Sequence, residues 1–250
     1  MKVIVNGIAT EYKDEGTGPI ILILHGWKAS LHTFDALTQF LTPSFRVLRL
    51  DLPGFGESEM PRTSWAIGDY ATFVKSFLEK LDLRIDILVG HSMGGRIAIK
   101  GVANNIFHPE KVVLMASAGV ARRRGIRNTF FLVTTKLGKL VTILPPFRKF
   151  GEKLRQRFYE KIGSDYFDAG ALKDIYLNII REDLSMLAGK ISVPTLLIWG
   201  SEDLTTPLED GRKLEKLIKG SKLEIIPSAG HLVPRENAEE VAALIKKFSL

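Results

Sequence analysis

The chain has 250 residues, of which 45% are hydrophobic and 25% charged, and its formal net charge is +7 at pH 7. These fractions are ordinary for a globular protein, and the length allows one large domain or two small ones. The absence of cysteine excludes disulfides, cysteine nucleophiles and thiolate metal sites. Residues 1–7 run directly into strand-like sequence without the apolar stretch of a secretory signal, so we expect a cytoplasmic protein.

The positive charge is concentrated in one part of the chain. Residues 121–190 contain 15 lysines and arginines against 7 aspartates and glutamates, whereas the rest of the chain contains 20 against 21. A basic surface attracts anionic groups, although its commonest role is to be solvated. No nucleic-acid-binding motif accompanies this charge, so we expect no nucleic-acid partner. Weak contact of this segment with a membrane or anionic lipid is a minority hypothesis.

The chain up to residue 89 alternates strand and helix patterns. An Asn6-Gly7 pair between two short strand candidates predicts an antiparallel hairpin at one edge of a sheet. The apolar run over 20–24 is typical of a strand that is covered on both faces. Apolar residues at three- and four-residue steps predict an amphipathic helix over 69–81. The predicted strands are 3–5, 8–12, 20–24, 46–50 and 85–89, and a further helix is predicted over 32–41.

The alternation continues after Ser92, stops between residues 121 and 190, and then resumes. Inside this interruption, apolar residues from Phe130 to Leu144 form a helical stripe, which lysines and prolines break too often for it to span a bilayer. The alternation elsewhere predicts a mostly parallel sheet with helices on both faces. The remaining predicted strands are 112–116, 195–199 and 223–226, and the remaining helices are the one after Ser92, 208–218 and 238–248.

One serine lies where a predicted strand turns into a predicted helix. Ser92 stands in the hexapeptide Gly90-His91-Ser92-Met93-Gly94-Gly95. So sharp a turn favours glycine on both sides of the serine, which gives the spacing Gly-x-Ser-x-Gly. The hydroxyl then projects above the sheet, and the amide of Met93, the first in the helix, can help to bind a developing oxyanion. Short Gly/Ser matches also occur in ordinary loops, so the assignment depends on partners elsewhere.

A nucleophilic serine needs a general base, and the base needs an orienting carboxylate. Asp203 and His231 each follow the end of a predicted strand, where functional residues of open parallel sheets gather. Asp203 is also suited to cap a turn before Thr205-Thr206-Pro207, Glu202 is a competing acid, and a lone loop histidine is most often structural. The common order of nucleophile, acid and base favours a catalytic triad of Ser92, Asp203 and His231.

With these residues in place, the chain resembles the alpha/beta-hydrolase superfamily over nearly its whole length apart from residues 121–190. The motifs that carry the resemblance are His25-Gly26-Trp27, Asp51 to Ser58, Gly90 to Gly95, Gly200 to Asp203 and Gly230-His231. The resemblance implies an alpha/beta-hydrolase core domain, residues 1–120 and 191–250, with a helical cap inserted at 121–190. It also implies that the backbone N–H of Trp27 joins that of Met93 in an oxyanion hole, and that no metal or organic cofactor is needed.

A serine nucleophile favours acyl transfer, because epoxide hydrolases and haloalkane dehalogenases of this superfamily use aspartate at that position. We expect a carboxylesterase or monoacylglycerol-lipase-like enzyme that hydrolyses small esters through an acyl-enzyme. A carbon–carbon hydrolase of ring-cleavage products is a second hypothesis, although such enzymes tend to carry asparagine and tryptophan where this chain has His91 and Leu232. The same fold also allows a cofactor-free perhydrolase or a slow-turnover ligand receptor.

Overall fold

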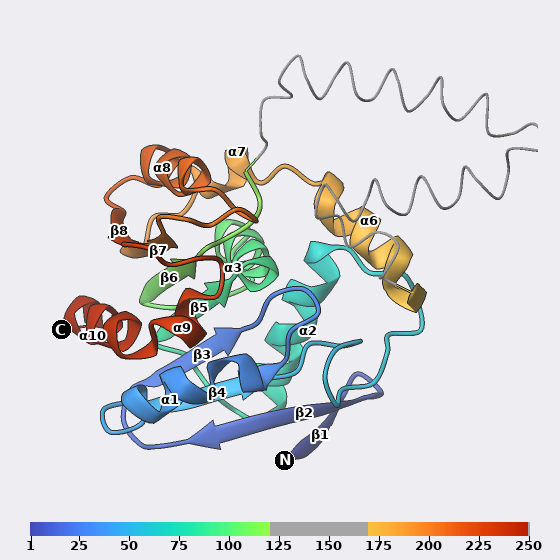
Figure 1. The fold of residues 1–250 in the computed structure, drawn as a ribbon. Helices are drawn as coiled ribbons and strands as arrows, with labels where there is room; N and C mark the ends of the chain where they lie inside the picture. The colour runs from blue at the N-terminus through green and yellow to red at the C-terminus, as the bar shows by residue number, and fades with distance from the viewer. Residues whose placement is uncertain (121–169, 250) are drawn as a thin grey trace, which may run out of the picture. The chain divides into compact units, whose positions relative to one another are not determined.

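The computed structural model describes residues 1–120 and 170–249 of the chain. Within these residues, eight strands form one sheet in the order β1-β2-β4-β3-β5-β6-β7-β8 (Figure 1). Strands β3 to β8 are mutually parallel, whereas β2 runs antiparallel to both β1 and β4. The prediction of a mostly parallel sheet is confirmed. The strands are β1 (Lys2–Val5), β2 (Ile8–Glu15), β3 (Ile20–Leu24), β4 (Arg46–Leu50), β5 (Ile87–His91), β6 (Lys111–Met115), β7 (Thr195–Gly200) and β8 (Lys222–Ile226).

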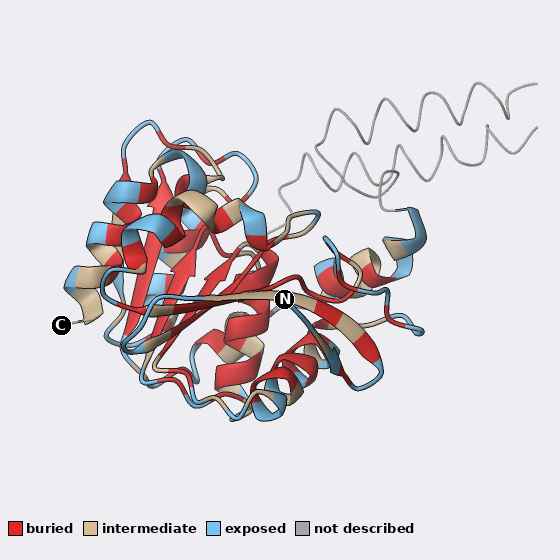
Figure 2. Ribbon diagram, turned by 90° about the horizontal axis from the view of Figure 1, so that it is seen from below, coloured by how far each residue is buried: buried red, intermediate tan, exposed pale blue. Residues whose placement is uncertain are grey.

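Helices cover both faces of the sheet, as the alternation of elements predicts (Figure 1). On one face α1, α9 and α10 pack together over the strands, and α2, α3 and α8 belong to the other face. The strands between them are largely buried, and exposed residues lie on the outer sides of the helices (Figure 2). The helical elements are η1 (Leu31–Phe34), α1 (Asp35–Leu41), α2 (Ile67–Lys80), α3 (Met93–Ala103), η3 (Gly170–Leu172), α6 (Lys173–Arg181), α7 (Ser185–Ala188), α8 (Leu208–Leu217), α9 (Val233–Glu236) and α10 (Ala238–Ser249).

The hairpin at the sheet edge forms around the Asn6-Gly7 pair, as predicted. Both residues have positive φ, 49° for Asn6 and 78° for Gly7, which is what a type I′ turn requires. Val5 and Ile8 pair across the turn. The second strand continues to Glu15, beyond its predicted end, because its last residues pair with β4.

The strand before Ser92 begins two residues later than predicted. Asp86 lies in a bend before β5, and its carboxylate accepts a hydrogen bond of 2.6 Å from the backbone amide of Ile20. At its other end the strand includes His91, so the chain turns directly at Ser92. The helix predicted over 32–41 is also modified, since a short 3-10 turn, η1, precedes α1.

By its internal contacts the chain divides into two units, Met1–Val120 with Asn178–Leu250, and Ala121–Leu177. Of the second unit, the structure describes η3 and the first residues of α6. Residues 178–190, which the sequence groups with the insert, belong to the first unit. The predicted apolar stripe from Phe130 to Leu144 and most of the basic charge of the insert lie outside the described residues. The helical cap at 121–190 remains a prediction.

Candidate active site

Ser92 occupies a strained turn between β5 and α3. Its backbone angles are φ 53° and ψ −111°, a region that residues other than glycine rarely adopt. The glycines around it are required by close packing. A Cβ atom on Gly90 would lie 2.6 Å from the carbonyl oxygen of Gly94, and one on Gly94 would lie 2.1 Å from that of Leu24. The Gly-x-Ser-x-Gly spacing therefore lets the turn close against β3.

The backbone of Ser92 is tied to the neighbouring strand as well. Its amide donates to the carbonyl of Met115 at 3.1 Å, and its carbonyl accepts from the amide of Ala118 at 3.1 Å. Met115 is the last residue of β6. Ser92 thus lies beyond the carboxyl ends of two parallel strands, the edge where such sheets place their functional residues.

The loop after β3, which carries Trp27, one of the two predicted oxyanion donors, approaches Ser92. A Cβ atom on Gly26 would lie 3.1 Å from the Cβ of Ser92, so the residue before Trp27 packs directly against Ser92. Met93 is the first residue of α3, where backbone amides have no acceptor within the helix. The side chain of His25 fixes the loop, because Nδ1 donates to the carbonyl of Gly26 at 2.8 Å and Nε2 accepts from the amide of Leu52 at 2.9 Å.

Asp203 follows β7 and is buried, with a fully covered side chain. Its Oδ1 accepts the backbone amides of Thr205 and Thr206 at 2.8 Å each, and its Oδ2 accepts the Thr206 hydroxyl at 2.8 Å. Burial by itself raises the pKa of Asp203, but the hydrogen bonds from His231 and Thr206, together with the charge of His231, more than offset it and lower the pKa. The carboxylate is therefore held in its ionised form.

His231 and Asp203 meet across the edge of the sheet. His231 Nδ1 donates to Asp203 Oδ2 at 2.8 Å. The loops that carry them are tied together, because the amide of Glu202 donates to the carbonyl of Ala229 at 2.9 Å. A Cβ atom on Gly200 would lie 2.3 Å from the same carbonyl, so only glycine permits this approach. Glu202, the competing acid, is exposed, and the carboxylate that contacts His231 is that of Asp203.

The structure brings two of the three predicted triad residues, Asp203 and His231, into contact. Among the described residues, the side-chain hydrogen bonds of His231 go to Asp203 and Thr206, and none joins the hydroxyl of Ser92 to His231. The link is made by the residue next to the serine. His91 Nε2 donates to the backbone carbonyl of His231 at 2.9 Å, and the centroids of the two rings lie 4.8 Å apart.

Two contributors to this arrangement are not evident from the sequence. His91 occupies a position of the Gly-x-Ser-x-Gly pattern that carries no required residue type, so no local signal marks it. Thr206 belongs to the turn that Asp203 is predicted to cap, and the sequence indicates no further role for it. Asp203 in fact has both roles, because Oδ1 caps the turn and Oδ2 contacts His231.

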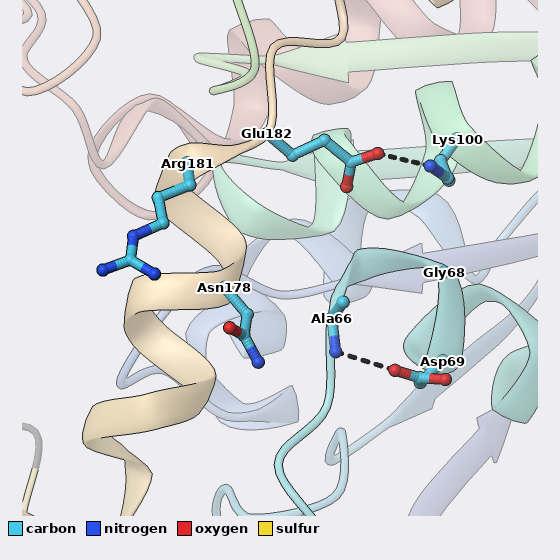
Figure 3. Close-up of a pocket in the computed structure, with 7 residues that line it drawn as sticks. All are labelled: Ala66, Gly68, Asp69, Lys100, Asn178, Arg181 and Glu182. Atoms are coloured by element: carbon cyan, nitrogen blue, oxygen red, sulfur yellow. Dashed lines mark hydrogen bonds and ion pairs between the residues drawn. The ribbon is translucent and has the colours of Figure 1, made fainter.

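A separate surface pocket of about 480 Å³ contains none of the predicted site residues (Figure 3). Two pairs of its lining residues bind each other. Asp69 accepts the amide of Ala66 at 2.8 Å, and Lys100 forms an ion pair with Glu182. Its lining residues are Ala66, Gly68, Asp69, Lys100, Asn178, Arg181 and Glu182.

Two further classes of site are absent from the described parts of the chain. In residues 1–120 and 170–249, no three His, Asp or Glu side chains are grouped so as to hold a metal ion. None of the helices in these same residues combines the length and apolar character needed to cross a bilayer.

Comparison with known proteins gives relatives of similar length. The uncharacterized hydrolase YugF of Bacillus subtilis is 29% identical over 258 residues, which cover 98% of this chain and 94% of the relative. A pimeloyl-[acyl-carrier protein] methyl ester esterase of Neisseria meningitidis is 31% identical over 247 residues, covering 91% and 92%. An esterase from Exiguobacterium antarcticum of known structure shares the fold, with a TM-score of 0.76 at 23% identity, covering 99% of this chain and 98% of that one.

The match to a family model extends over almost the entire chain. The model of the alpha/beta hydrolase family matches residues 21–244, a range that includes the Ser92 turn, Asp203 and His231. The strand order, the parallel sheet and the two helical layers described above accompany this match. The chain therefore belongs to the alpha/beta hydrolase family.

Proposed function

We propose that this hydrolase cleaves carboxylic esters with Ser92 as its nucleophile, through an acyl-enzyme intermediate. The observation that carries the proposal is the 2.8 Å hydrogen bond from His231 to the buried carboxylate of Asp203. The backbone of His231 is in turn bonded by His91, the residue before Ser92 in the strained strand-to-helix turn. This arrangement provides a base, its orienting acid and a serine hydroxyl. The methyl ester esterase relative from Neisseria meningitidis supports ester substrates as the class.

The proposed reaction begins with proton transfer from the serine. Because Nδ1 of His231 donates to Asp203, Nε2 of the neutral ring is the unprotonated nitrogen and can act as the base. Ser92 Oγ attacks the ester carbonyl carbon while Nε2 accepts its proton, and Asp203 stabilises the imidazolium. The backbone amides of Trp27 and Met93 bind the oxyanion.

The intermediate then breaks the bond between the carbonyl carbon and the alcohol oxygen, and the departing alcohol takes the proton from Nε2. Water, deprotonated by His231 Nε2, attacks the carbonyl carbon of the acyl-enzyme. The bond between this carbon and Ser92 Oγ then breaks, Oγ takes the proton back from Nε2, and the acid is released. All atoms of ester and water are thereby accounted for. We also propose that the segment at 121–190 selects the acyl group, so that an optimum in acyl-chain length reports on that segment.

The test combines a substrate series with a substrate-independent probe. Wild type, Ser92→Ala and the control Ser44→Ala, which changes an exposed serine, are assayed on p-nitrophenyl esters from acetate to palmitate, and each is treated with a fluorophosphonate. We expect wild type and Ser44→Ala to turn over esters and to be labelled. Ser92→Ala should lose labelling and reduce kcat by a factor on the order of 10⁴ to 10⁶.

Two outcomes contradict separate parts of the proposal. Labelling of Ser92→Ala at the wild-type level rejects Ser92 as the nucleophile. Labelling of Ser92 in wild type without turnover of any ester retains Ser92 as the nucleophile and rejects esters as the substrate class. Carbon–carbon cleavage, perhydrolysis and slow-turnover ligand binding would then be the functions to test.

A further inference from the structure

Thr206 is held in a fixed place beside the acid–base pair. It is 4% exposed and lies in the loop between β7 and α8, three residues after Asp203. Its carbonyl accepts a hydrogen bond of 2.7 Å from the indole nitrogen of Trp199, which is fully buried in β7. The sheet itself therefore fixes the position of Thr206.

The polar atoms of Thr206 contact both members of the pair. Its amide donates to Asp203 Oδ1 and its hydroxyl to Asp203 Oδ2, both at 2.8 Å. Oδ2 is the same oxygen that accepts His231 Nδ1, and the Thr206 hydroxyl oxygen lies 3.2 Å from that nitrogen. Thr206 thus bonds both carboxylate oxygens and also contacts the imidazole.

The hydroxyl has one proton and two acceptors within reach. Besides Asp203 Oδ2, the carbonyl oxygen of Ala116 lies 3.0 Å from Thr206 Oγ1. The carboxylate is the stronger acceptor because it is charged and fully buried. A proton donated to Oδ2 reduces the negative charge that this oxygen presents to His231.

We propose that Thr206 is a positioning residue that sets how strongly Asp203 holds the proton of His231, and that orients Oδ2 toward the imidazole. The proposal rests on the proposed function of Ser92, Asp203 and His231. Without the hydroxyl, Oδ2 would keep His231 as its remaining side-chain donor and would bind the imidazolium more tightly. The base would then be protonated over a wider pH range, and activity would be lost on the acid side of the profile.

Other charged groups near the imidazole do not replace this donor. Among the described residues, the titratable side chains on elements next to His231 are His91 at the end of β5, Asp203 and the exposed Glu202 in the loop after β7, and Arg235 and Glu236 of α9. Burial, followed by the charge of His231, lowers the pKa of His91 to about 4, so His91 is neutral while the enzyme works. A carboxylate oxygen of Glu236 lies 3.8 Å from the Cβ position of Gly230, and an anion there cannot donate to Asp203.

The test replaces the hydroxyl and nothing else. Thr206→Val keeps the size of the side chain and the backbone bonds, Thr206→Ser restores a hydroxyl, and Thr195→Val is the matched control. Thr195 is a buried threonine whose hydroxyl donates to a carbonyl, that of Val193, outside the site. For each variant, kcat and KM are measured against pH, and the His231 ring is titrated by NMR.

We expect Thr206→Val to raise the kinetic pKa on the acid side of kcat/KM by about 0.5–1 unit, with KM within about twofold. The NMR midpoint of the His231 ring should move up by the same amount. Thr206→Ser and Thr195→Val should reproduce the wild type. An unchanged NMR midpoint in folded Thr206→Val overturns the proposal, as does an equal shift in Thr206→Ser or Thr195→Val. If wild type hydrolyses no ester, the proposed function fails, while the NMR titration still decides the role of Thr206.

Discussion

His91 donates a hydrogen bond from Nε2 to the backbone carbonyl of His231, 2.9 Å away, although the two residues are 140 positions apart in the chain. Since Nε2 carries the proton, Nδ1 of the neutral ring is an acceptor, and it is buried without a hydrogen-bond partner in the described structure. His91, the residue before Ser92, thereby holds the backbone of His231. The turn at Ser92 and the loop of His231 are one connected unit.

The buried His91 ring makes stability depend on pH. Its pKa falls from 6.5 to about 4 on folding, first through burial and then through the charge of His231. Between these values the unfolded chain binds a proton that the folded protein does not, so the free energy of unfolding falls as the pH falls. The full effect of His91 is about 3 kcal/mol at pH 4.

The variant His91→Gln tests this linkage, because glutamine does not titrate and its amide can donate at the position of Nε2. Urea unfolding at several values between about pH 7 and about pH 4.5 should give a shallower loss of stability than in wild type. The control His108→Gln removes an exposed histidine. Equal slopes in wild type and His91→Gln would show that His91 is not the group responsible.

Gly26→Ala should impair catalysis more than folding. The added methyl would lie 3.1 Å from the Cβ of Ser92 and 3.2 Å from His91 Nδ1, so the loop that precedes Trp27 must move by a few tenths of an ångström. Misplaced oxyanion donors reduce kcat, here by about tenfold, with little change in KM. In the control Gly68→Ala the methyl meets only Lys100 Cε at 3.8 Å. Wild-type kcat in Gly26→Ala would mean that this loop does not contribute to the reaction.

Gly200→Ala should separate the acid from the base. Its methyl would lie 2.3 Å from the carbonyl oxygen of Ala229 and 2.4 Å from that of Gly230, and backbone atoms cannot give way as a flexible side chain can. We expect a loss of about 1–3 kcal/mol in unfolding free energy and a lower kcat. Gly189→Ala, where the nearest atoms lie 3.7 Å away, is the control. Thermal unfolding and ester assays measure both effects, and a variant as active and stable as Gly189→Ala would contradict the close approach.

Arg96 should be required for stability. It is 6% exposed on α3 and donates to the carbonyls of Ile179 and Glu182, and burial lowers its pKa to about 10 despite the nearby charge of Glu182. Arg96→Met would leave these acceptors without their donor and cost about 2–4 kcal/mol. Arg181→Met, an exposed arginine, is the control. Denaturant unfolding distinguishes them, and equal midpoints would show that the two carbonyls find other partners.

The sequence by itself determined most of the strands and helices of the core and the strand-to-helix turn at Ser92. Strands such as Ile20–Leu24 and the turn at Ser92 depend on local patterns, namely apolar runs and glycine spacing, which the chain displays within a few residues. The common order of nucleophile, acid and base along the chain added the prediction that Ser92, Asp203 and His231 form a triad. The short helix α9 was not predicted, and several predicted elements begin or end at other residues. The second strand, for example, extends to Glu15 because it pairs with β4.

Only the tertiary structure decided which side chains of distant segments are in contact. Glu202 and Asp203 are adjacent carboxylates, and burial against Thr206 and His231 selects Asp203. The bond of His91 to His231 joins residues from opposite halves of the chain. Such contacts depend on strand order and loop packing, which bring together side chains that no local pattern relates, and for this reason the sequence did not reveal the roles of His91 and Thr206.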